Sequence, residues 1–388
     1  MVVTTCLLVL LTANSSTRAD ILVARLGTSS YRAREDAARD LVGLGRYSLA
    51  PLRRGQSNPD LEIAERCKRL LPLAEVETAR QRIARIHSVV IADPRSLVPC
   101  DEPLLRRFLA VTGDSRAARD LYLEIYRTHG KFLDAIEFAD ARAGGEAFWQ
   151  YVDQVLMFPD GRTHVDLSSL TFNPEDLALF WFLSAHPDIR PAECRGIGRK
   201  DFPYYTPRHA EIHLTGANAS PVMRRLFVIW MAGPRNIADR QADERMVKTG
   251  FHLAATARLK EVRPIALRTA LDPKTTSSQP AALLALAQVG EPEDADRLAD
   301  LISNDRVAYK PSPARDQDRA CVIGDLALAA SIRISGQKLT DFGFADSSQA
   351  DPTDFRIYVF ASADRRAAAR KKWAEFVAVR TGSAGGKR

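Results

Sequence analysis

Two histidines one helical turn apart are the residues best suited to chemistry in this chain, in the run His209-Ala-Glu-Ile-His213. A spacing of four residues places two imidazoles on one face of a helix, as a zinc site requires. The metalloprotease order is His-Glu-x-x-His, however, and here Glu211 stands at the centre. The run also contains the His-x-Glu of deaminases, but no Pro-Cys-x-x-Cys follows to supply the other ligands. His209 and His213 are therefore weak candidates for a metal site, and a polar surface or a satisfied hydrogen bond is the alternative.

Other groupings contain residue types found in active sites but lack the spacing that the chemistry needs. A Cys–His pair would have to come from the following residues, around which no family-specific motif occurs: His164, Asp166, His186, Asp188 and Cys194. A calcium site at Asp346, Asp351 and Asp354 would lack the central glycine and terminal glutamate of an EF-hand loop. The run Asp341-Phe-Gly343 lacks the accompanying kinase motifs and indicates a helix-exit turn. We predict no catalytic residue and no cofactor.

The composition is that of a folded chain with a basic tail. Of its 388 residues, 46% are hydrophobic and 27% charged, which excludes general disorder. The net charge is +7, but residues 365–388 contain eight Lys or Arg and one Glu, so the rest of the chain is nearly neutral. The charge therefore does not predict nucleic-acid binding. The tail could contact an anionic surface, and a solvated end is the simpler interpretation.

The N-terminal segment 1–19 has the pattern of a signal peptide. Its apolar run, 6–13, is too short for a membrane span, which needs about 20 residues, and a small residue, Ala19, ends the segment. No Lys or Arg precedes the run, so a misassigned start codon or an apolar lead-in to the first helix is the alternative. We predict export to the periplasm or the exterior, without a transmembrane segment. Four cysteines would then meet an oxidising compartment, and neither their pairing nor the oligomeric state can be deduced: Cys67, Cys100, Cys194 and Cys321.

The most regular part of the chain, from Ser278 to Gly336, predicts stacked helices. The expected elements are an apolar helix at 281–289, an amphipathic helix from 291, a polar loop at 304–318 and a second apolar helix at 320–334. Pro280 suits the first helical turn, and Gly290 suits a left-handed residue after the last turn. The helix ends at Gly290 and Gly336 lie 46 residues apart, within the roughly 40–47 residues of HEAT and armadillo repeats.

The same order of elements occurs near the N-terminus, as a helix at 31–45, a short helix with an internal Pro at 48–52 and a charged helix at 59–71. This pattern resembles a HEAT-type module. Three further runs resemble an uncharacterised group of signal-bearing bacterial HEAT-like proteins: 108–133, 324–330 and 335–344. The resemblance covers about half of the chain. It implies an all-α fold, a HEAT-like (armadillo-type) α-solenoid of stacked helical hairpins with an irregular helical middle region, and it implies no activity.

Asp325 is a carboxylate inside an apolar helix, and buried charge must be paired. In HEAT-like repeats, an acid at such a position bonds neighbouring backbone or an arginine of the next repeat. The resemblance therefore implies a structural ladder in which Arg319 and Arg333 are possible partners of Asp325.

The sequence divides into five predicted segments: a signal peptide at 1–19, an N-terminal HEAT-like module at 20–92, the middle region at 104–245, C-terminal HEAT-like repeats at 246–340, and a loop, capping helix and basic tail at 341–388. Aromatic residues gather in the middle region, notably at 180–182 and at Tyr204 and Tyr205. Aromatics at helical spacing usually fill a core, and an exposed patch is the alternative.

These observations favour a non-enzymatic, exported helical-repeat scaffold that binds another protein, because stacked repeats expose extended surfaces. The alternative is a hydrolase or metal-dependent enzyme with its site in the middle region, near His209 and His213. The sequence does not identify the partner or the face that would bind it.

Overall fold

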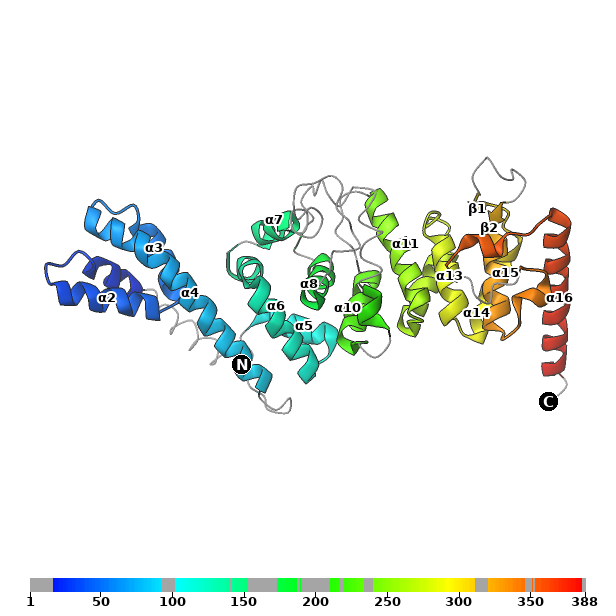
Figure 1. The fold of residues 1–388 in the computed structure, drawn as a ribbon, viewed down its shortest axis with the longest axis horizontal. Coiled ribbons are helices and arrows are strands. Elements are labelled where there is room, and N and C mark those ends of the chain that lie inside the picture. Colours follow the sequence, from blue (N-terminus) through cyan, green and yellow to red (C-terminus); the bar gives the residue numbers. More distant parts are fainter. Residues whose placement is uncertain are drawn as a thin grey trace. The chain divides into compact units, whose positions relative to one another are not determined.

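The computed structural model describes residues 17–91, 102–139, 141–151, 173–186, 189, 210–215, 219–233, 240–310, 320–345, 351 and 353–385 (Figure 1). The chain forms two compact units. The N-terminal unit comprises Met1–Arg106 and Asp114–Gly130, and the C-terminal unit comprises Arg107–Gly113 and Lys131–Arg388.

The N-terminal unit is built from helices throughout its described part. Residues 17–25 are helical, and the helices that follow are α2 (Tyr31–Gly43), α3 (Arg46–Gly55), α4 (Leu61–Ile91), part of α5 (Pro103–Thr112) and most of α6 (Arg116–Asp134). The Ser30 hydroxyl accepts the Ala33 N–H at the start of α2. Gly45, with φ +54°, allows the sharp turn into α3 that the sequence predicts at this glycine.

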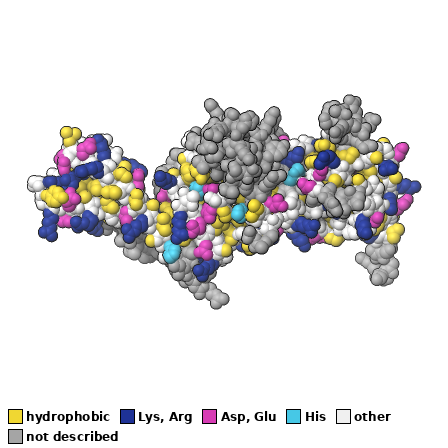
Figure 2. All heavy atoms as spheres, viewed as in Figure 1, with side chains coloured by type: hydrophobic (Ala, Val, Ile, Leu, Met, Phe, Trp, Pro, Cys, Tyr) yellow, Lys and Arg dark blue, Asp and Glu magenta, His cyan; other side chains and the backbone are white. Residues whose placement is uncertain are grey.

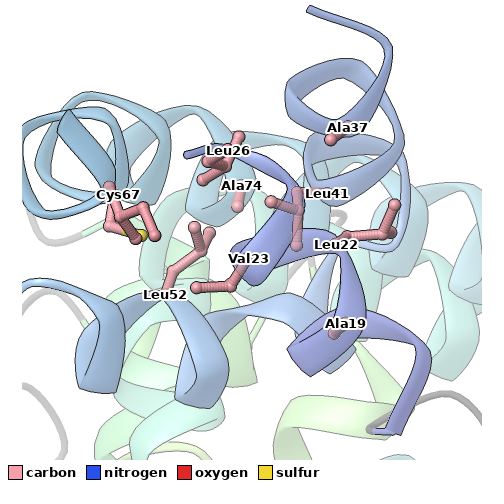
Figure 3. Packing of buried hydrophobic residues seen from close by; sticks show 10 residues of the cluster. Ala19, Leu22, Val23, Leu26, Ala37, Leu41, Leu52, Cys67 and Ala74 are labelled. Atoms are coloured by element: carbon pink, nitrogen blue, oxygen red, sulfur yellow. The ribbon is translucent and has the colours of Figure 1, made fainter. Parts of the chain in front are cut away.

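The core of this unit forms where the helix at 17–25 meets α2, α3 and α4 (Figure 3). Leu26, Leu41, Leu52 and Cys67 are fully buried there. Ala19, the predicted last residue of the signal peptide, is also fully buried in this core. Residues 1–16 lie outside the described part, so the signal peptide stays a prediction.

Helix α4 is longer than the charged helix predicted at 59–71. It continues to Ile91 with Pro72 inside it. Pro72 lacks a backbone N–H, yet residues on both sides of it, Cys67 and Ala74, are buried in the same core, and this shared face keeps the helix in one piece. On this longer helix Val76 is 69% exposed, whereas Arg82 is buried.

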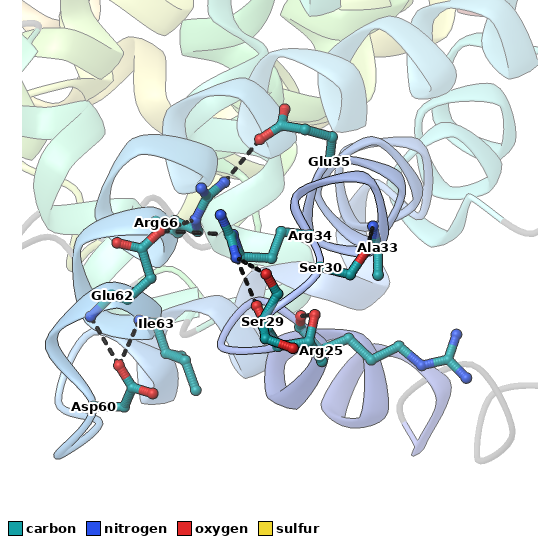
Figure 4. Close-up of polar contacts among 11 residues, drawn as sticks. Arg25, Ser29, Ser30, Ala33, Arg34, Glu35, Asp60, Glu62, Ile63 and Arg66 are labelled. Atoms are coloured by element: carbon teal, nitrogen blue, oxygen red, sulfur yellow. Dashed lines mark hydrogen bonds and ion pairs between the residues drawn. The ribbon is translucent and has the colours of Figure 1, made fainter.

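Several basic side chains of the N-terminal helices form ion pairs with acids (Figure 4). The Arg66 guanidinium lies 2.9 Å from Glu35 Oε1 and 2.6 Å from Glu62 Oε1. Arg34 Nη1 donates to the carbonyls of Thr28 and Ser29 at 2.7 and 3.0 Å. These contacts hold α2 against α4, so the basic residues here serve the fold.

The C-terminal unit is also helical, apart from two short strands in its described part. Its elements are η1 (Ala135–Ala139), α7 (Ala141–Tyr151), α8 (Pro174–Ser184), a helical segment at 210–214, α10 (Pro221–Ala232), α11 (Arg240–Thr256), η5 (Lys260–Val262), α12 (Arg263–Leu271), α13 (Gln279–Val289), α14 (Pro292–Arg297), η6 (Ala299–Ser303), β1 (Val307–Tyr309), β2 (Cys321–Val322), α15 (Ile323–Ile334), η7 (Leu339–Phe342), η8 (Phe355–Tyr358) and α16 (Ala363–Gly385). The all-α class is therefore confirmed.

Aromatic side chains of the middle region fill a core between helices, as predicted. Phe180, Trp181 and Phe182 on α8 are 2–4% exposed. The Trp181 ring packs edge-on against Phe227 of α10 at a centroid distance of 5.3 Å. Tyr204 and Tyr205 lie outside the described residues.

The apolar helices α13 and α15 are buried as the sequence predicts. Every residue from Gln279 to Leu286 is buried, and so is every residue from Ile323 to Ile332. Helix α13 contacts both α11 and α15, while α12 also packs on α13 and α14 packs on α15. The shorter α12 and α14 thus alternate in sequence with a contacting series formed by α11, α13 and α15 (Figure 1).

The sequence predicts a polar loop at 304–318 followed by a helix from 320. The prediction is wrong at both ends of this loop, where short strands form. Val307–Tyr309 and Cys321–Val322 pair as antiparallel strands, and α15 begins only at Ile323. The close approach of Gly324 explains the pairing, because its N–H donates to the Asn304 carbonyl at 2.8 Å. This contact brings the start of α15 beside the segment that precedes β1.

Gly290 does not adopt the left-handed conformation that the sequence analysis expects. Its φ and ψ are −68° and 160°, so any residue could adopt its backbone conformation. Glycine is needed for space instead, because a Cβ here would lie 2.5 Å from Ile334 Cδ1 and 2.7 Å from the Leu286 carbonyl oxygen. Gly336, predicted only as a helix end, has a positive φ of +72°.

We expect Gly290→Ala to lower the free energy of unfolding by about 1–3 kcal/mol, because the added methyl group overpacks the contact between α13 and α15. Gly43→Ala is the control, since a Cβ at Gly43 meets no atom within 4 Å, and alanine in a helix should raise stability by up to about 1 kcal/mol. Urea denaturation followed by circular dichroism measures both. Equal losses in the two variants would contradict the steric explanation.

Candidate functional site

Two aspartates that are fully buried in the described part of the C-terminal unit, Asp294 and Asp325, are held by arginines from neighbouring helices. Asp294, the third residue of α14, is fully buried and accepts the Glu291 N–H at 3.0 Å. Arg263, the first residue of α12, donates from Nε to Asp294 Oδ2 at 2.7 Å and from Nη2 to Oδ1 at 3.0 Å. Although burial raises the pKa of Asp294, its bonds with Arg263 and the Glu291 N–H outweigh burial and lower it. The carboxylate stays charged and joins two helices.

Asp325 repeats this arrangement one helix pair later. It is the third residue of α15, is fully buried, and accepts the Val322 N–H at 3.1 Å. Arg366 of α16 donates from Nε to Asp325 Oδ1 at 2.8 Å and from Nη2 to Oδ2 at 3.0 Å. We call these two sets, Asp294 with Arg263 and Asp325 with Arg366, the Asp–Arg clamps. In each, one carboxylate caps its own helix and binds an arginine in the bidentate geometry that makes such pairs strong.

The backbone bond predicted for Asp325 is thus present, while its arginine partner is one that the sequence analysis did not name. Arg366 lies 41 residues further along the chain. Arg333 is placed over the Tyr358 ring, 5.8 Å from the ring centroid, and Arg319 lies outside the described residues. Burial raises the pKa of Asp325, and Arg366 opposes that rise.

Helix α16 is fastened to the helices before it at several points besides Arg366. Arg370 Nη2 lies 2.8 Å from Asp305 Oδ1, and Arg380 pairs with Asp296 of α14. Trp373, which is 6% exposed, packs edge-on against Phe342.

A second grouping surrounds Phe355, where four side chains from three elements meet. The Tyr309 ring stacks on the Phe355 ring at 5.9 Å and 14°. His252 of α11 lies 5.9 Å from the same ring, and Lys248 Nζ lies 5.6 Å from its centroid. We call Lys248, His252, Tyr309 and Phe355 the Phe355 cluster. It joins the strand pair and η8 to α11.

His252 in this cluster is held in its neutral form. Burial, together with the nearby Lys248 ammonium, lowers its pKa from 6.5 to about 4. Its Nε2 is buried and makes no hydrogen bond. An imidazole in this environment is an apolar packing group at neutral pH.

Because the folded-state pKa of His252 lies below 6.5, the unfolded chain takes up the proton first as the pH falls. Stability should therefore decline between pH 6.5 and about 4, by up to about 1.4 kcal/mol for each pH unit from this group. His252→Phe should remove this part of the pH dependence. Thermal unfolding of both proteins at pH 7, 6 and 5 measures the difference, and parallel losses in the two proteins would refute the assignment.

The residues proposed from sequence as possible ligands or catalytic groups do not come together in the described part of the chain. His213 is partly exposed in the helical segment at 210–214, and His186 is 6% exposed. Asp354 binds the Arg356 guanidinium at 2.8 Å, and Asp351 accepts the Thr353 hydroxyl at 2.7 Å. The others lie outside the described residues: His164, Asp166, Asp188, Cys194, His209 and Asp346.

No cluster of three His, Cys, Asp or Glu side chains suited to a metal ion occurs within the described ranges. Cys67 and Cys321 are buried free thiols, and burial raises the pKa of both. Cys100 lies outside the described residues. No helix in the part of the chain that could be searched is both long and apolar enough for a membrane span.

Comparison with protein-family models, with curated proteins and with solved structures gave no match to this chain.

Proposed function

We propose that this chain is a non-enzymatic, exported helical-repeat scaffold that binds another protein, with its C-terminal unit built as a HEAT-like α-solenoid of stacked hairpins. The observation that carries the proposal is the recurrence of the Asp–Arg clamp. A buried aspartate at the third position of a helix is held by an arginine of a neighbouring helix first at Asp294 and again at Asp325.

The order of contacts between helices supports the same architecture. Repeat proteins stack one supersecondary unit on the next, so that each unit contacts mainly its neighbours. Helix α13 contacts α11 before it and α15 after it, and the intervening helices α12 and α14 pack beside this series. Helix α16, with its buried Trp373 and its exposed outer residues, has the properties of a terminal capping helix.

Affinity capture from the native envelope, with the full chain as bait, tests the proposal. A second bait carrying Arg366→Ala, which should destabilise the C-terminal unit, shows whether capture requires the intact fold. We expect a protein partner to be retained in a fixed ratio by the intact chain. Elemental analysis of the same preparation provides the opposing outcome. Stoichiometric zinc that is lost on replacing His209 and His213 with alanine would overturn the proposal in favour of a metal-dependent enzyme.

Export is the part of the proposal that rests on residues 1–19 alone, and cell fractionation tests it separately. We expect the mature chain in the periplasm or the medium, beginning near Asp20 by N-terminal sequencing. Recovery of the full chain, with Met1, in the cytoplasm would refute export.

A further inference from the structure

An exposed apolar pair lies on the outer face of helix α4. Leu73 is 54% exposed and Val76 is 69% exposed, whereas Ala74 between them is fully buried in the core. Residues three apart share a helix face, so Leu73 and Val76 form one continuous apolar surface.

Two exposed arginines border this pair along the helix. Arg69 lies four residues before Leu73, and Arg80 lies four residues after Val76, so the four residues follow one face for about 16 Å. The Arg80 side chain is 80% exposed, and its contact with Glu77 is 3.5 Å long. Such an exposed pair contributes little and is easily exchanged for another partner. We call Arg69, Leu73, Val76 and Arg80 the α4 stripe.

We propose that the α4 stripe docks an amphipathic helix of another protein, whose apolar residues cover Leu73 and Val76 and whose acidic residues face Arg69 and Arg80. The inference rests on the proposed scaffold function and names the chemistry of the partner. An apolar centre with charges at one turn to either side is how helices select one another side by side. Figure 2 shows hydrophobic side chains bordered by Lys and Arg on the surface of the N-terminal helices.

The charges of the α4 stripe favour an acidic partner helix over two other occupants, a second copy of this chain and an anionic membrane surface. If a second copy paired on the α4 stripe in antiparallel orientation, Arg69 would face Arg80 of the other copy, and a parallel pairing would place each arginine against its own equivalent. Both arrangements juxtapose like charges, which is unfavourable. An anionic membrane surface is disfavoured because helices that bind such surfaces carry clusters of about 4–8 Lys or Arg, and the α4 stripe has only Arg69 and Arg80.

Photo-crosslinking from the stripe tests the proposal with the full chain in the native envelope. A photoreactive phenylalanine analogue replaces Leu73, and in a control protein it replaces Val379, which is 71% exposed in the C-terminal unit. We expect a crosslink at position 73 to a segment with helical apolar spacing and acids one turn to either side. A crosslink to the chain itself, to lipid or to a segment without acids would overturn the proposal, and so would the absence of any crosslink.

Charge reversal at the two arginines of the α4 stripe is the second part of this crosslinking test. Arg69→Glu with Arg80→Glu should reduce the crosslink at least tenfold, while the matched pair Arg25→Glu with Arg32→Glu, two exposed arginines outside α4, should leave it unchanged. Circular dichroism confirms that each protein is folded. If affinity capture succeeds but position 73 yields no crosslink, the scaffold function stands and the docking site is wrong. If capture fails as well, both are wrong.

Discussion

Replacing Arg366 with alanine is expected to lower the free energy of unfolding of the C-terminal unit by about 3–5 kcal/mol, because it leaves a fully buried carboxylate without its cation. Asp325 is 0% exposed, and Arg366 supplies two of its hydrogen bonds. Arg366 also donates to the Ala320 carbonyl at 2.8 Å, so the variant loses the link between α16 and the strand that precedes α15. Urea denaturation followed by circular dichroism measures the loss.

Arg370→Ala is the matched control on the same helix, four residues further on. The Arg370 side chain is 24% exposed and its partner Asp305 is 73% exposed, so the pair faces water through its carboxylate and should contribute about 0–1 kcal/mol. Equal effects of the two substitutions would show that the Asp–Arg clamp is no more than a surface pair. The clamp could then not serve as the device that joins successive helices.

The second large effect is expected at Arg82 in the N-terminal unit. Arg82 Nε donates to Glu102 Oε2 at 2.7 Å, and the two side chains are 1% and 5% exposed. The guanidinium also lies over the Tyr126 ring at 4.8 Å. Arg82→Ala should lower the free energy of unfolding by about 3–5 kcal/mol, because it leaves Glu102 buried with its principal partner removed.

Arg80→Ala, two positions away on α4, should change stability by less than about 0.5 kcal/mol, since the Arg80 side chain is 80% exposed. A double variant, Arg82→Met with Glu102→Leu, separates the cost of an orphaned charge from the loss of the pair. It should be more stable than Arg82→Ala, because apolar residues of similar volume often replace a buried ion pair without loss. If the double variant is the less stable of the two, the buried pair itself stabilises the unit.

Most helices could be predicted because local patterns determine them. The apolar run of α13 behind Pro280, and the end of α15 just before Gly336, follow from residue types at fixed spacing. The prediction failed where packing overrode the local pattern. Pro72 suggests a break that the shared core on both sides prevents, and Gly290 suggests a left-handed turn where close packing against Ile334 explains the glycine.

The candidate site was predictable only in part. Asp325 was identified because a carboxylate in an apolar helix must find a partner, but Arg366 was not, since nothing near Asp325 in the sequence marks a residue 41 positions away. Asp294 and Arg82 were missed because each lies in a segment rich in charge. In such a segment the sequence pattern around a buried charged residue is the same as that around a solvated one. The outward position of Val76 was missed for the complementary reason, since an apolar residue at helical spacing is normally assigned to the core.

By itself, the sequence determined the helical class, the positions of the apolar helices and the need to pair Asp325, because these depend on periodicity and on the free energy of burying charge. The tertiary structure decided which arginine pairs with each buried aspartate, which face of α4 is left to solvent, and that Tyr309 and His252 meet at Phe355. Such decisions depend on contacts between residues distant in sequence, and many pairings of similar energy are compatible with the same local patterns until the chain is packed.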